Sequence, residues 1–254
     1  MHTSLIMNCI PLTTNRLTDY RSLMKSLLTL LTVLALSPSL WASCLDGALS
    51  PEQNFKACHL AAEKGKADAQ KQLGSLYLAG EGVQQNYSQA LHWFEQAAAQ
   101  GHAIATYNIG VLHDKGLGLK KDYDEASKWY LKSAEMGYSS AQYNLGIMYE
   151  YGQTVEEDPA RAMELYLKAA EQGEAAAQFA IGLMYDKGTG VEKDPTQAYM
   201  WWQIAGEGHP HAIHNRDSIA EDMTPMQISE GKRLAKAWQD ARSGLVQLPS
   251  PELQ

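Results

Sequence analysis

Four segments of this 254-residue chain repeat one pattern at a fixed interval of 36 residues. Several columns of the pattern hold the same residue in every copy, among them Gly74, Gly110, Gly146, Gly182, then Gly80, Gly116, Gly152, Gly188, then Ala90, Ala126, Ala162, Ala198. Self-similarity at a period of about 20 to 50 residues is typical of repeat architectures, in which each unit stacks on its neighbours. Residues 67–209 therefore predict a solenoid.

Each unit has the pattern of two helices joined by a glycine turn. In the first unit Ala69, Leu73 and Leu76 share one face of a helix. The glycine after Leu73 lies inside that helix, where it costs about 1 kcal/mol relative to alanine, so its recurrence predicts a close approach by another helix. A Gly-x-Gly-Val turn follows, and Asn86 and its counterparts are good N-caps for the second helix. Thr154 replaces the second turn glycine in the third unit, so that turn is expected to differ.

The combined pattern resembles the Sel1-like repeat, a relative of the tetratricopeptide repeat. The residues that carry the resemblance are Ala-x-x-x-(Leu/Ile)-Gly-x-(Leu/Met)-(Tyr/His) in the first helix, the Gly-x-Gly-Val turn, and the alanine pair and glycine that end the second helix. The resemblance implies an all-α, right-handed α/α superhelical solenoid whose first helices line the concave surface. Its four repeats are residues 67–102, 103–138, 139–174 and 175–209.

The segments on either side of the repeats are predicted to be caps, which terminal repeats need where their outer faces meet water. Residues 43–66 are predicted to be an N-terminal half-repeat, because residues 51–65 align with the second helix of a preceding unit. Residues 210–242 are expected to form two capping helices. Residues 243–254 are expected to form a flexible tail, as chain ends without packing partners commonly do.

Residues 1–42 are predicted to be a signal peptide region. Lys25 precedes a short apolar run and then small residues, which together mark a secretory signal. The run is shorter than the roughly 20 apolar residues that a membrane span needs. Cleavage is expected between Ala42 and Ser43, and Met24 is favoured as the true start because it opens an ordinary signal sequence. The protein is therefore expected in the periplasm or outside the cell.

The mature chain keeps two cysteines, Cys44 and Cys58. In an oxidising compartment such a pair favours a disulfide. A lipid anchor on Cys44 is the alternative, although Trp41 stands where a lipobox usually has leucine. Residues 1–42 carry three basic residues and one acidic residue, so the mature chain has 18 basic and 28 acidic residues and a net charge of −10. Such a surface repels phosphate backbones, and nucleic acid is not expected as a partner.

Two groups of residues could support catalysis or metal binding, and packing explains both more simply. Ser229 and Lys232 match Ser-x-x-Lys, the nucleophile motif of penicillin-recognising enzymes, but the sequence lacks the accompanying Ser-Asp-Asn and Lys-Thr-Gly motifs. His209, His211 and His214 are of the residue type that binds zinc or copper, yet no carboxylate or thiol stands beside them at ligand spacing. Neither an enzyme activity nor a metal or other cofactor is therefore predicted.

One face of the first helices lies off the apolar stripe and is a candidate binding surface. Aromatic and amide side chains recur there at the repeat spacing, at Tyr107, Asn108, Tyr143, Asn144, Phe179, His214 and Asn215. Aromatic rings beside amides can stack on an extended peptide and hydrogen-bond its backbone. The alternative is that Tyr107 and Tyr143 only cover neighbouring helices.

These patterns favour a binding protein over an enzyme. We expect an exported, monomeric scaffold or adaptor that holds a protein or peptide against its concave helical surface. Two other functions stay open at this point. One is a β-lactamase-like or cell-wall-peptide hydrolase, which the resemblance to cysteine-rich Sel1-like proteins suggests, and the other is a secreted, host-directed effector.

Overall fold

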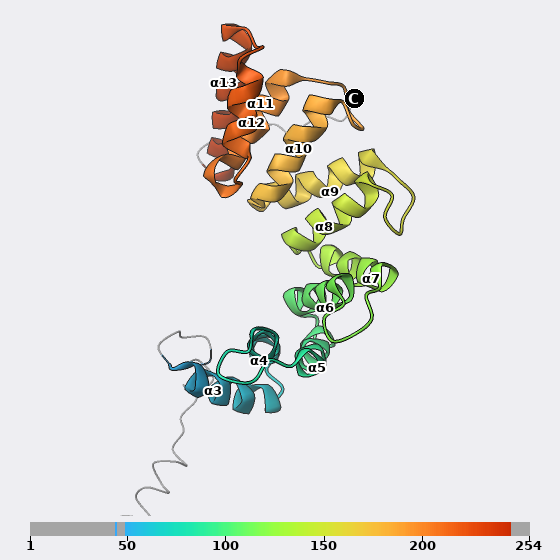
Figure 1. Ribbon diagram of the computed structural model, residues 1–254. Helices are drawn as coiled ribbons and strands as arrows, with labels where there is room; N and C mark the ends of the chain where they lie inside the picture. The colour runs from blue at the N-terminus through green and yellow to red at the C-terminus, as the bar shows by residue number, and fades with distance from the viewer. Residues whose placement is uncertain (1–43, 45–48, 245–254) are drawn as a thin grey trace, which may run out of the picture.

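A computed structural model of the protein describes residue 44 and residues 49–244. These residues form eleven α-helices and one short 3-10 helix, and they contain no strand. The helices stack in chain order into a curved solenoid that runs from α3 to α13 (Figure 1). The predicted all-α solenoid is confirmed. The predicted signal region, with its cleavage site at Ala42 and Ser43, lies outside the described residues.

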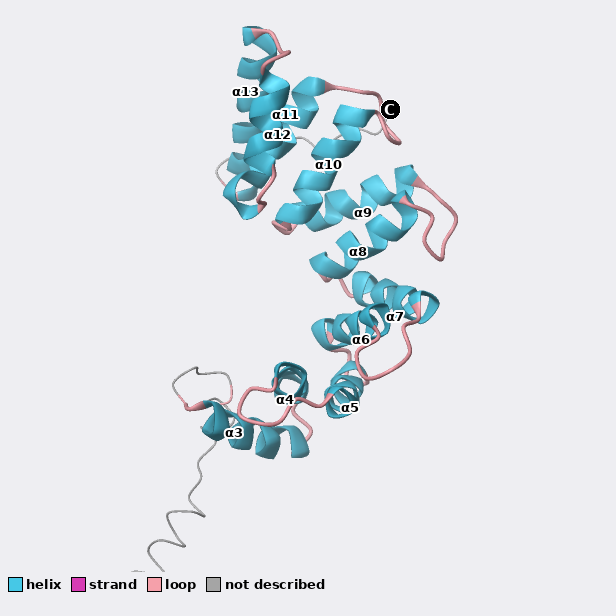
Figure 2. Ribbon diagram, in the orientation of Figure 1, coloured by secondary structure: helices cyan, strands magenta, loops and turns pink. Residues whose placement is uncertain are grey.

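The four repeats contribute alternating first and second helices (Figure 2). The first helices are α4 (Ala67–Ala79), α6 (Ala103–Lys115), α8 (Ser139–Glu150) and α10 (Ala175–Lys187). The second helices are α5 (Tyr87–Ala98), α7 (Tyr123–Glu135), α9 (Pro159–Glu171) and α11 (Pro195–Ala205). The flanking elements are α3 (Pro51–Glu63), the 3-10 helix η1 (Gly206–Gly208), α12 (Ala212–Ala220) and α13 (Pro225–Arg242). From α3 to α12 each helix packs mainly on its neighbours in the chain, whereas α13 packs on α11.

The second helices begin where the sequence places their caps. The side chains of Asn86, Asp122, Asp158 and Asp194 each accept a hydrogen bond from the backbone N–H three residues further on. Such a cap satisfies one of the N–H groups that a helix start leaves unpaired. Most first helices end on a glycine in the left-handed conformation, as Gly80 does with φ +76°, so the chain turns sharply into the next helix.

The glycine inside each first helix marks a close contact with an aromatic ring. A Cβ added to Gly74 would lie 2.6 Å from Phe94, and one added to Gly110 would lie 2.7 Å from Tyr130. The two remaining repeats form the same pairs, Gly146 with Tyr166 and Gly182 with Trp202. Any side chain there would overlap the ring, so the close approach predicted from these glycines is confirmed.

The turn of the third repeat differs less than its sequence predicts. Thr154 has a φ of +66°, close to the +72° of Gly118 at the same place in the second repeat. The difference lies at the helix end, because α8 stops at Glu150, one residue earlier than its counterparts. A β-branched residue in the left-handed region is strained, so this turn holds Thr154 in a glycine conformation.

The two ends of the solenoid are closed by different means. A disulfide joins Cys44 to Cys58 of α3, with the two Cα atoms 4.8 Å apart, and both cysteines are buried. At the other end α13 covers α11, and the rings of Trp201 and Trp238 meet edge to face at 5.4 Å. Within the described part of the chain, every helix is too short or too polar to cross a membrane.

Candidate functional site

The predicted binding residues lie along α6, α8, α10 and α12, which succeed one another as the first helices of adjoining units. Six of them are half-buried, namely Tyr107, Asn108, Tyr143, Asn144, Phe179 and Asn215, and His214 is exposed. We call this surface the face of the first helices. Its side chains are partly exposed to solvent and partly packed against the helices beneath.

Each aromatic residue of this face rests on an aromatic residue of its own second helix. The ring centroids are 5.4 Å apart for Tyr107 and Tyr130, and 5.7 Å apart for Tyr143 and Tyr166. Phe179 lies on Trp202 in the same way, at 6.3 Å. The alternative interpretation, in which the tyrosines cover neighbouring helices, thus accounts for one side of each ring. Tyr107 and Phe179 each have a second aromatic contact, with Tyr138 and His209, and all three aromatic residues of the face remain partly exposed.

A hydrogen bond links two first helices across the face. The side-chain amide of Asn144 on α8 donates to the hydroxyl of Tyr107 on α6, over 3.2 Å. Burial raises the pKa of Tyr107, while the bond from Asn144 acts in the opposite direction. The phenol is therefore neutral at pH 7, and its own O–H stays available to donate.

A pocket of about 460 Å³ opens beside this hydrogen bond, between α6 and α8. Its lining residues are Tyr107, Val111, Asp114, Lys115, Tyr123, Tyr130, Asn144, Ile147, Met148 and Gln153. We call it the α6–α8 pocket. Its lining combines a carboxylate, an ammonium, two amides and three phenols with apolar side chains, so it offers both polar and apolar contacts to a ligand.

Tyr130 is the most enclosed of the groups that line this pocket. Only 1% of the residue is exposed, and its hydroxyl lies near Asp114 and Asn144 without a hydrogen bond of standard geometry. Burial raises its pKa first, and the nearby charge of Asp114 raises it further. The hydroxyl is enclosed by the surrounding side chains and is not itself exposed to the pocket.

A second pocket repeats part of this arrangement two units further along, between α10 and α12. It has a volume of about 290 Å³ and is lined by Asp186, Trp202, His214, Asn215, Ser218, Ile219 and Asp222. Asp186 and Trp202 occupy the columns of Asp114 and Tyr130. Asn215 occupies that of Asn144, once the one-residue deletion at the end of the fourth repeat is counted. We call it the α10–α12 pocket.

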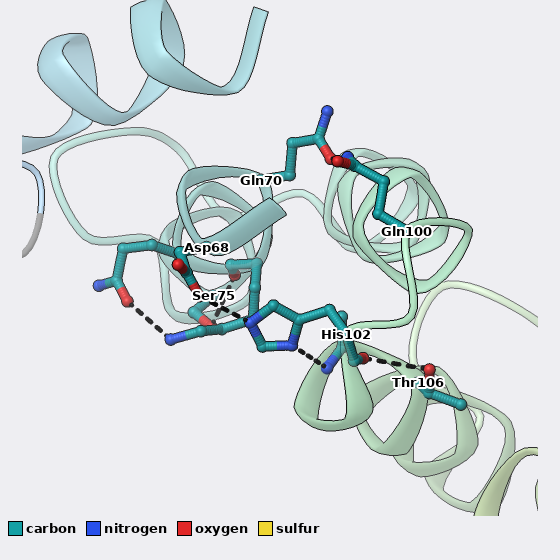
Figure 3. A network of polar contacts seen from close by, with 9 residues as sticks. Asp68, Gln70, Ser75, Gln100, His102 and Thr106 are labelled. Atoms are coloured by element: carbon teal, nitrogen blue, oxygen red, sulfur yellow. Dashed lines mark hydrogen bonds and ion pairs between the residues drawn. The ribbon is translucent and has the colours of Figure 1, made fainter. Parts of the chain in front are cut away.

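A column of buried glutamines beneath the face was missed by the sequence reasoning. Gln70, Gln142 and Gln178 are buried, and each side-chain amide donates to a carbonyl near the end of the preceding helix, over 3.2 to 3.4 Å. Figure 3 shows the first of these junctions, where Gln100 also donates to Gln70 over 2.6 Å. The recurrence of glutamine at one column was the available signal.

The same junction holds a histidine that acts as a helix cap. His102 Nδ1 accepts from the backbone N–H of Ala105 at the start of α6, and its Nε2 lies 3.2 Å from Asp68 (Figure 3). Side chains of successive units are therefore joined by polar contacts, which fix how one repeat is placed on the next.

The residues considered for catalysis and metal binding have other surroundings. Ser229 and Lys232 are both exposed on α13. His209 stacks on Phe179 with the ring centroids 3.9 Å apart, and burial lowers its pKa, as does the neighbouring His211. No three histidine, cysteine or acidic side chains are grouped to hold a metal ion in the described part of the chain.

Comparison with known proteins agrees with this architecture. The family model of the Sel1 repeat matches residues 67–102, 103–138, 139–174 and 175–209. The chain belongs to the Sel1 repeat family. Proteins of this family are generally scaffolds for protein–protein interaction and are mostly non-catalytic.

Two solved structures of Sel1 repeat proteins resemble this one. The first is c5321, a protective antigen present in uropathogenic Escherichia coli strains, with 32% identity, a TM-score of 0.71 and coverage of 83% of this chain and 47% of its own. The chain thus spans about half the length of that relative. The second is a Sel1 repeat protein from Oxalobacter formigenes, with 32% identity, a TM-score of 0.65 and coverage of 78% and 80%. The comparison with curated proteins gave no match.

Proposed function

We propose that this Sel1 repeat protein is an exported scaffold that binds an extended segment of a partner protein along the face of its first helices. The observation that carries the proposal is the recurrence of aromatic and amide side chains on adjoining first helices, from Tyr107 on α6 to Asn215 on α12. Two pockets built from the same columns lie on this face. Extended peptides bind through such alternating pockets and through hydrogen bonds to their backbone.

Export is supported by two features of the chain. The Cys44–Cys58 disulfide indicates an oxidising compartment, because such bonds are rare where thiols are kept reduced. The apolar run before Ala42 has the form of a secretory signal. Both features point to the periplasm or the exterior of the cell, and the partner should therefore be sought there.

The test is capture of a partner from periplasmic extract by the immobilised mature protein. A Tyr107→Ala, Tyr143→Ala double variant should bind the captured partner at least about tenfold more weakly, since truncating an interfacial aromatic typically costs 1–2 kcal/mol or more. Because both rings also pack on second helices, the thermal midpoint of the variant must be measured in parallel. Asn144→Ala, which spares the rings, should weaken binding in the same direction.

Two controls locate the binding surface. Leu131→Ala removes an exposed apolar side chain from the second helix α7, and Ser229→Ala alters the closing helix α13. Both should leave the affinity for the partner unchanged. If the folded double tyrosine variant binds normally while Leu131→Ala weakens binding, the partner lies on the second helices and the proposal is wrong.

A further inference from the structure

The third repeat lacks an aromatic side chain that the other three repeats share. One column of the second helices holds Trp93, Trp129 and Trp201, and in the third repeat the same column holds Leu165. The three tryptophans pack in equivalent places, on the apolar clusters that α3 and α4, α5 and α6, and α9 and α10 form. Each indole thus covers the first helix of its own unit and the helix before it.

A pocket of about 290 Å³ lies where the third repeat would hold its indole, between α7 and α9 and above α8. Its lining residues are Leu131, Ala134, Glu135, Gly137, Gln142, Leu145, Tyr149, Arg161, Leu165 and Lys168. We call it the α7–α9 pocket. Ala134, Leu145 and Leu165 belong to one buried apolar cluster. Ala134 and Leu145 occupy the columns of Ala98 and Ile109, which lie in the cluster beneath the tryptophan of the second repeat.

One apolar wall of this pocket stays open to solvent. Leu131 of α7 lines the pocket and is 43% exposed. Its counterpart in α3 is His59, whose ring meets the indole of Trp93 with the centroids 5.9 Å apart. Where the tryptophan is present it therefore contacts this column, and where it is absent the leucine is left exposed. A pocket with such a wall can receive an anchor side chain of a partner.

The charges around the pocket favour an aromatic ring over an aliphatic side chain. The charged lining residues are Arg161 and Lys168 of α9 and Glu135 of α7. Arg161 pairs with Glu164 along α9, whereas Lys168 has no ion pair within the described part of the chain. In the second repeat the counterpart of this lysine, Lys132, has its Nζ 5.3 Å from the ring centroid of Trp129. Lys168 can lie over a bound indole in the same way, and tryptophan is the ring that attracts a cation most strongly.

From these observations we propose that the α7–α9 pocket binds a tryptophan side chain of a partner protein. The indole would take the place that Trp129 has in the second repeat, with Leu131 and Leu165 beside it and Lys168 over its face. Pockets for drug-sized ligands typically enclose roughly 300–1,000 Å³. The volume of about 290 Å³ therefore suits one large side chain.

This pocket is separate from the face of the first helices. Gln142, Leu145 and Tyr149 line it, and because they follow one another at i, i+3 and i+7 they share one side of α8. Asn144, whose amide carries the hydrogen bond of the proposed binding face, lies two residues after Gln142 and so about 200° around the helix. The inference therefore goes beyond the proposed function, since it names a second interaction surface on the opposite side of α8.

The probe is N-acetyl-tryptophanamide, titrated into the protein labelled with nitrogen-15. Shifts of the Ala134 and Leu145 backbone amides should saturate with a dissociation constant in the roughly millimolar range that a ligand of this size reaches. The side-chain amide of Asn215, in the α10–α12 pocket, should not move. The matched control is N-acetyl-leucinamide, which has the same backbone and a smaller, non-aromatic side chain, and it should bind at least about fivefold more weakly. Equal binding of the two probes, or no saturable shift, would overturn the proposal.

Four variants locate the indole in the pocket. Leu165→Trp fills the pocket from within the chain, so the response to the probe should disappear while the thermal midpoint stays at or above that of the parent. Leu131→Glu places in α7 the residue that α5 has as Glu95, so the fold should persist and binding should weaken at least about fivefold. Lys168→Gln should weaken binding of the tryptophan probe about threefold. Lys132→Gln, at the same column of the second repeat, is the control and should have no effect.

The variants also state what would contradict the proposal. A folded Leu165→Trp variant that binds the probe as the parent does would place the probe elsewhere. If that variant does not fold, an unaffected Leu131→Glu variant would overturn the proposal in its place. Shifts of the Ala134 and Leu145 amides that depend on protein concentration, with no probe added, would assign the pocket to a second copy of this chain and not to another protein.

This proposal and the proposed function can fail separately. If the tryptophan probe does not bind, the proposed function stands, because the double tyrosine variant tests the opposite side of α8. If the probe binds as expected while the double tyrosine variant still captures its partner, the α7–α9 pocket is right and the face of the first helices is wrong.

Discussion

The second and third repeats share one framework but treat the same buried tyrosine differently. In the third repeat Tyr166 donates to Glu150, and in the second repeat Tyr130 lies near the shorter Asp114 without a hydrogen bond of standard geometry. Glutamate is one methylene longer than aspartate. The longer side chain of the third repeat reaches its phenol at hydrogen-bond distance, and the shorter one of the second repeat does not.

The second and third repeats also differ in the residue that the next unit places beside them. The second repeat is followed by Asn144, whose amide reaches Tyr107, while the third is followed by Ala180 at the same column. The α6–α8 junction thus gains a polar wall that its neighbour lacks. In a solenoid each unit contacts only its neighbours, so a site can arise at one junction without changing the others.

The largest expected effect on the free energy of unfolding comes from the buried alanines that both repeats share. Ala126 and Ala162 are both fully buried at equivalent helix crossings, so replacing either by leucine should lower the free energy of unfolding by about 1–3 kcal/mol through overpacking. The two urea midpoints should fall by similar amounts. Lys128→Leu, at a side chain that is 70% exposed, is the control. If Ala126→Leu and Lys128→Leu have equal midpoints, the assignment of buried and exposed faces in α7 is wrong.

The two tyrosines should respond differently to loss of their hydroxyls. Tyr166→Phe should lower the free energy of unfolding by about 1.5 kcal/mol, the lower end for a hydrogen bond to a charged group, because Glu150 is partly exposed. Tyr130→Phe should have a smaller effect, because the buried oxygen that it removes has no hydrogen bond of standard geometry. Chemical denaturation of both variants checks this contrast. Equal losses would mean that Tyr130 is as well bonded as Tyr166.

The turns of the two repeats offer a smaller contrast. Thr154 holds a φ of +66° where the second repeat has Gly118. Relief of that conformation in Thr154→Gly should raise the free energy of unfolding by about 1 kcal/mol, after allowance for the greater freedom of glycine in the unfolded chain. The reverse change, Gly118→Thr, should destabilise, because a Cβ at Gly118 would overlap Tyr87. A less stable Thr154→Gly would show that the threonine side chain is itself needed in the turn.

Much of the fold follows from the repeat itself. The period locates both helices of each unit, the N-caps at Asn86 and its counterparts are visible as residue types, and the repeated cost of a helical glycine such as Gly74 implies its close contact with Phe94. These features are local to one unit or recur in every unit. They can therefore be predicted from a single sequence.

The candidate site could be predicted only in part. The columns of Tyr107 and Asn144 were found because they lie off the apolar stripe, but their hydrogen bond joins two units and depends on how those units stack. From its residue type alone, Gln142 would be placed on the surface. In the structure it is buried, and its side-chain amide donates to the carbonyl of Ala134. The different surroundings of the Tyr130 and Tyr166 hydroxyls depend on the length of one carboxylate side chain, which no periodicity reveals.

The smallest expected effect tests the comparison most directly. Asp114→Glu gives the second repeat the carboxylate of the third, so Tyr130 should acquire the hydrogen bond that Tyr166 has. The free energy of unfolding should then rise by about 0.5–1 kcal/mol, the usual net contribution of one hydrogen bond. Chemical denaturation should show the gain, and the converse change Glu150→Asp should lower the stability of the third repeat, because the shorter carboxylate no longer reaches Tyr166. Were Asp114→Glu to leave the free energy of unfolding unchanged, the length of this side chain would not be what separates the two repeats.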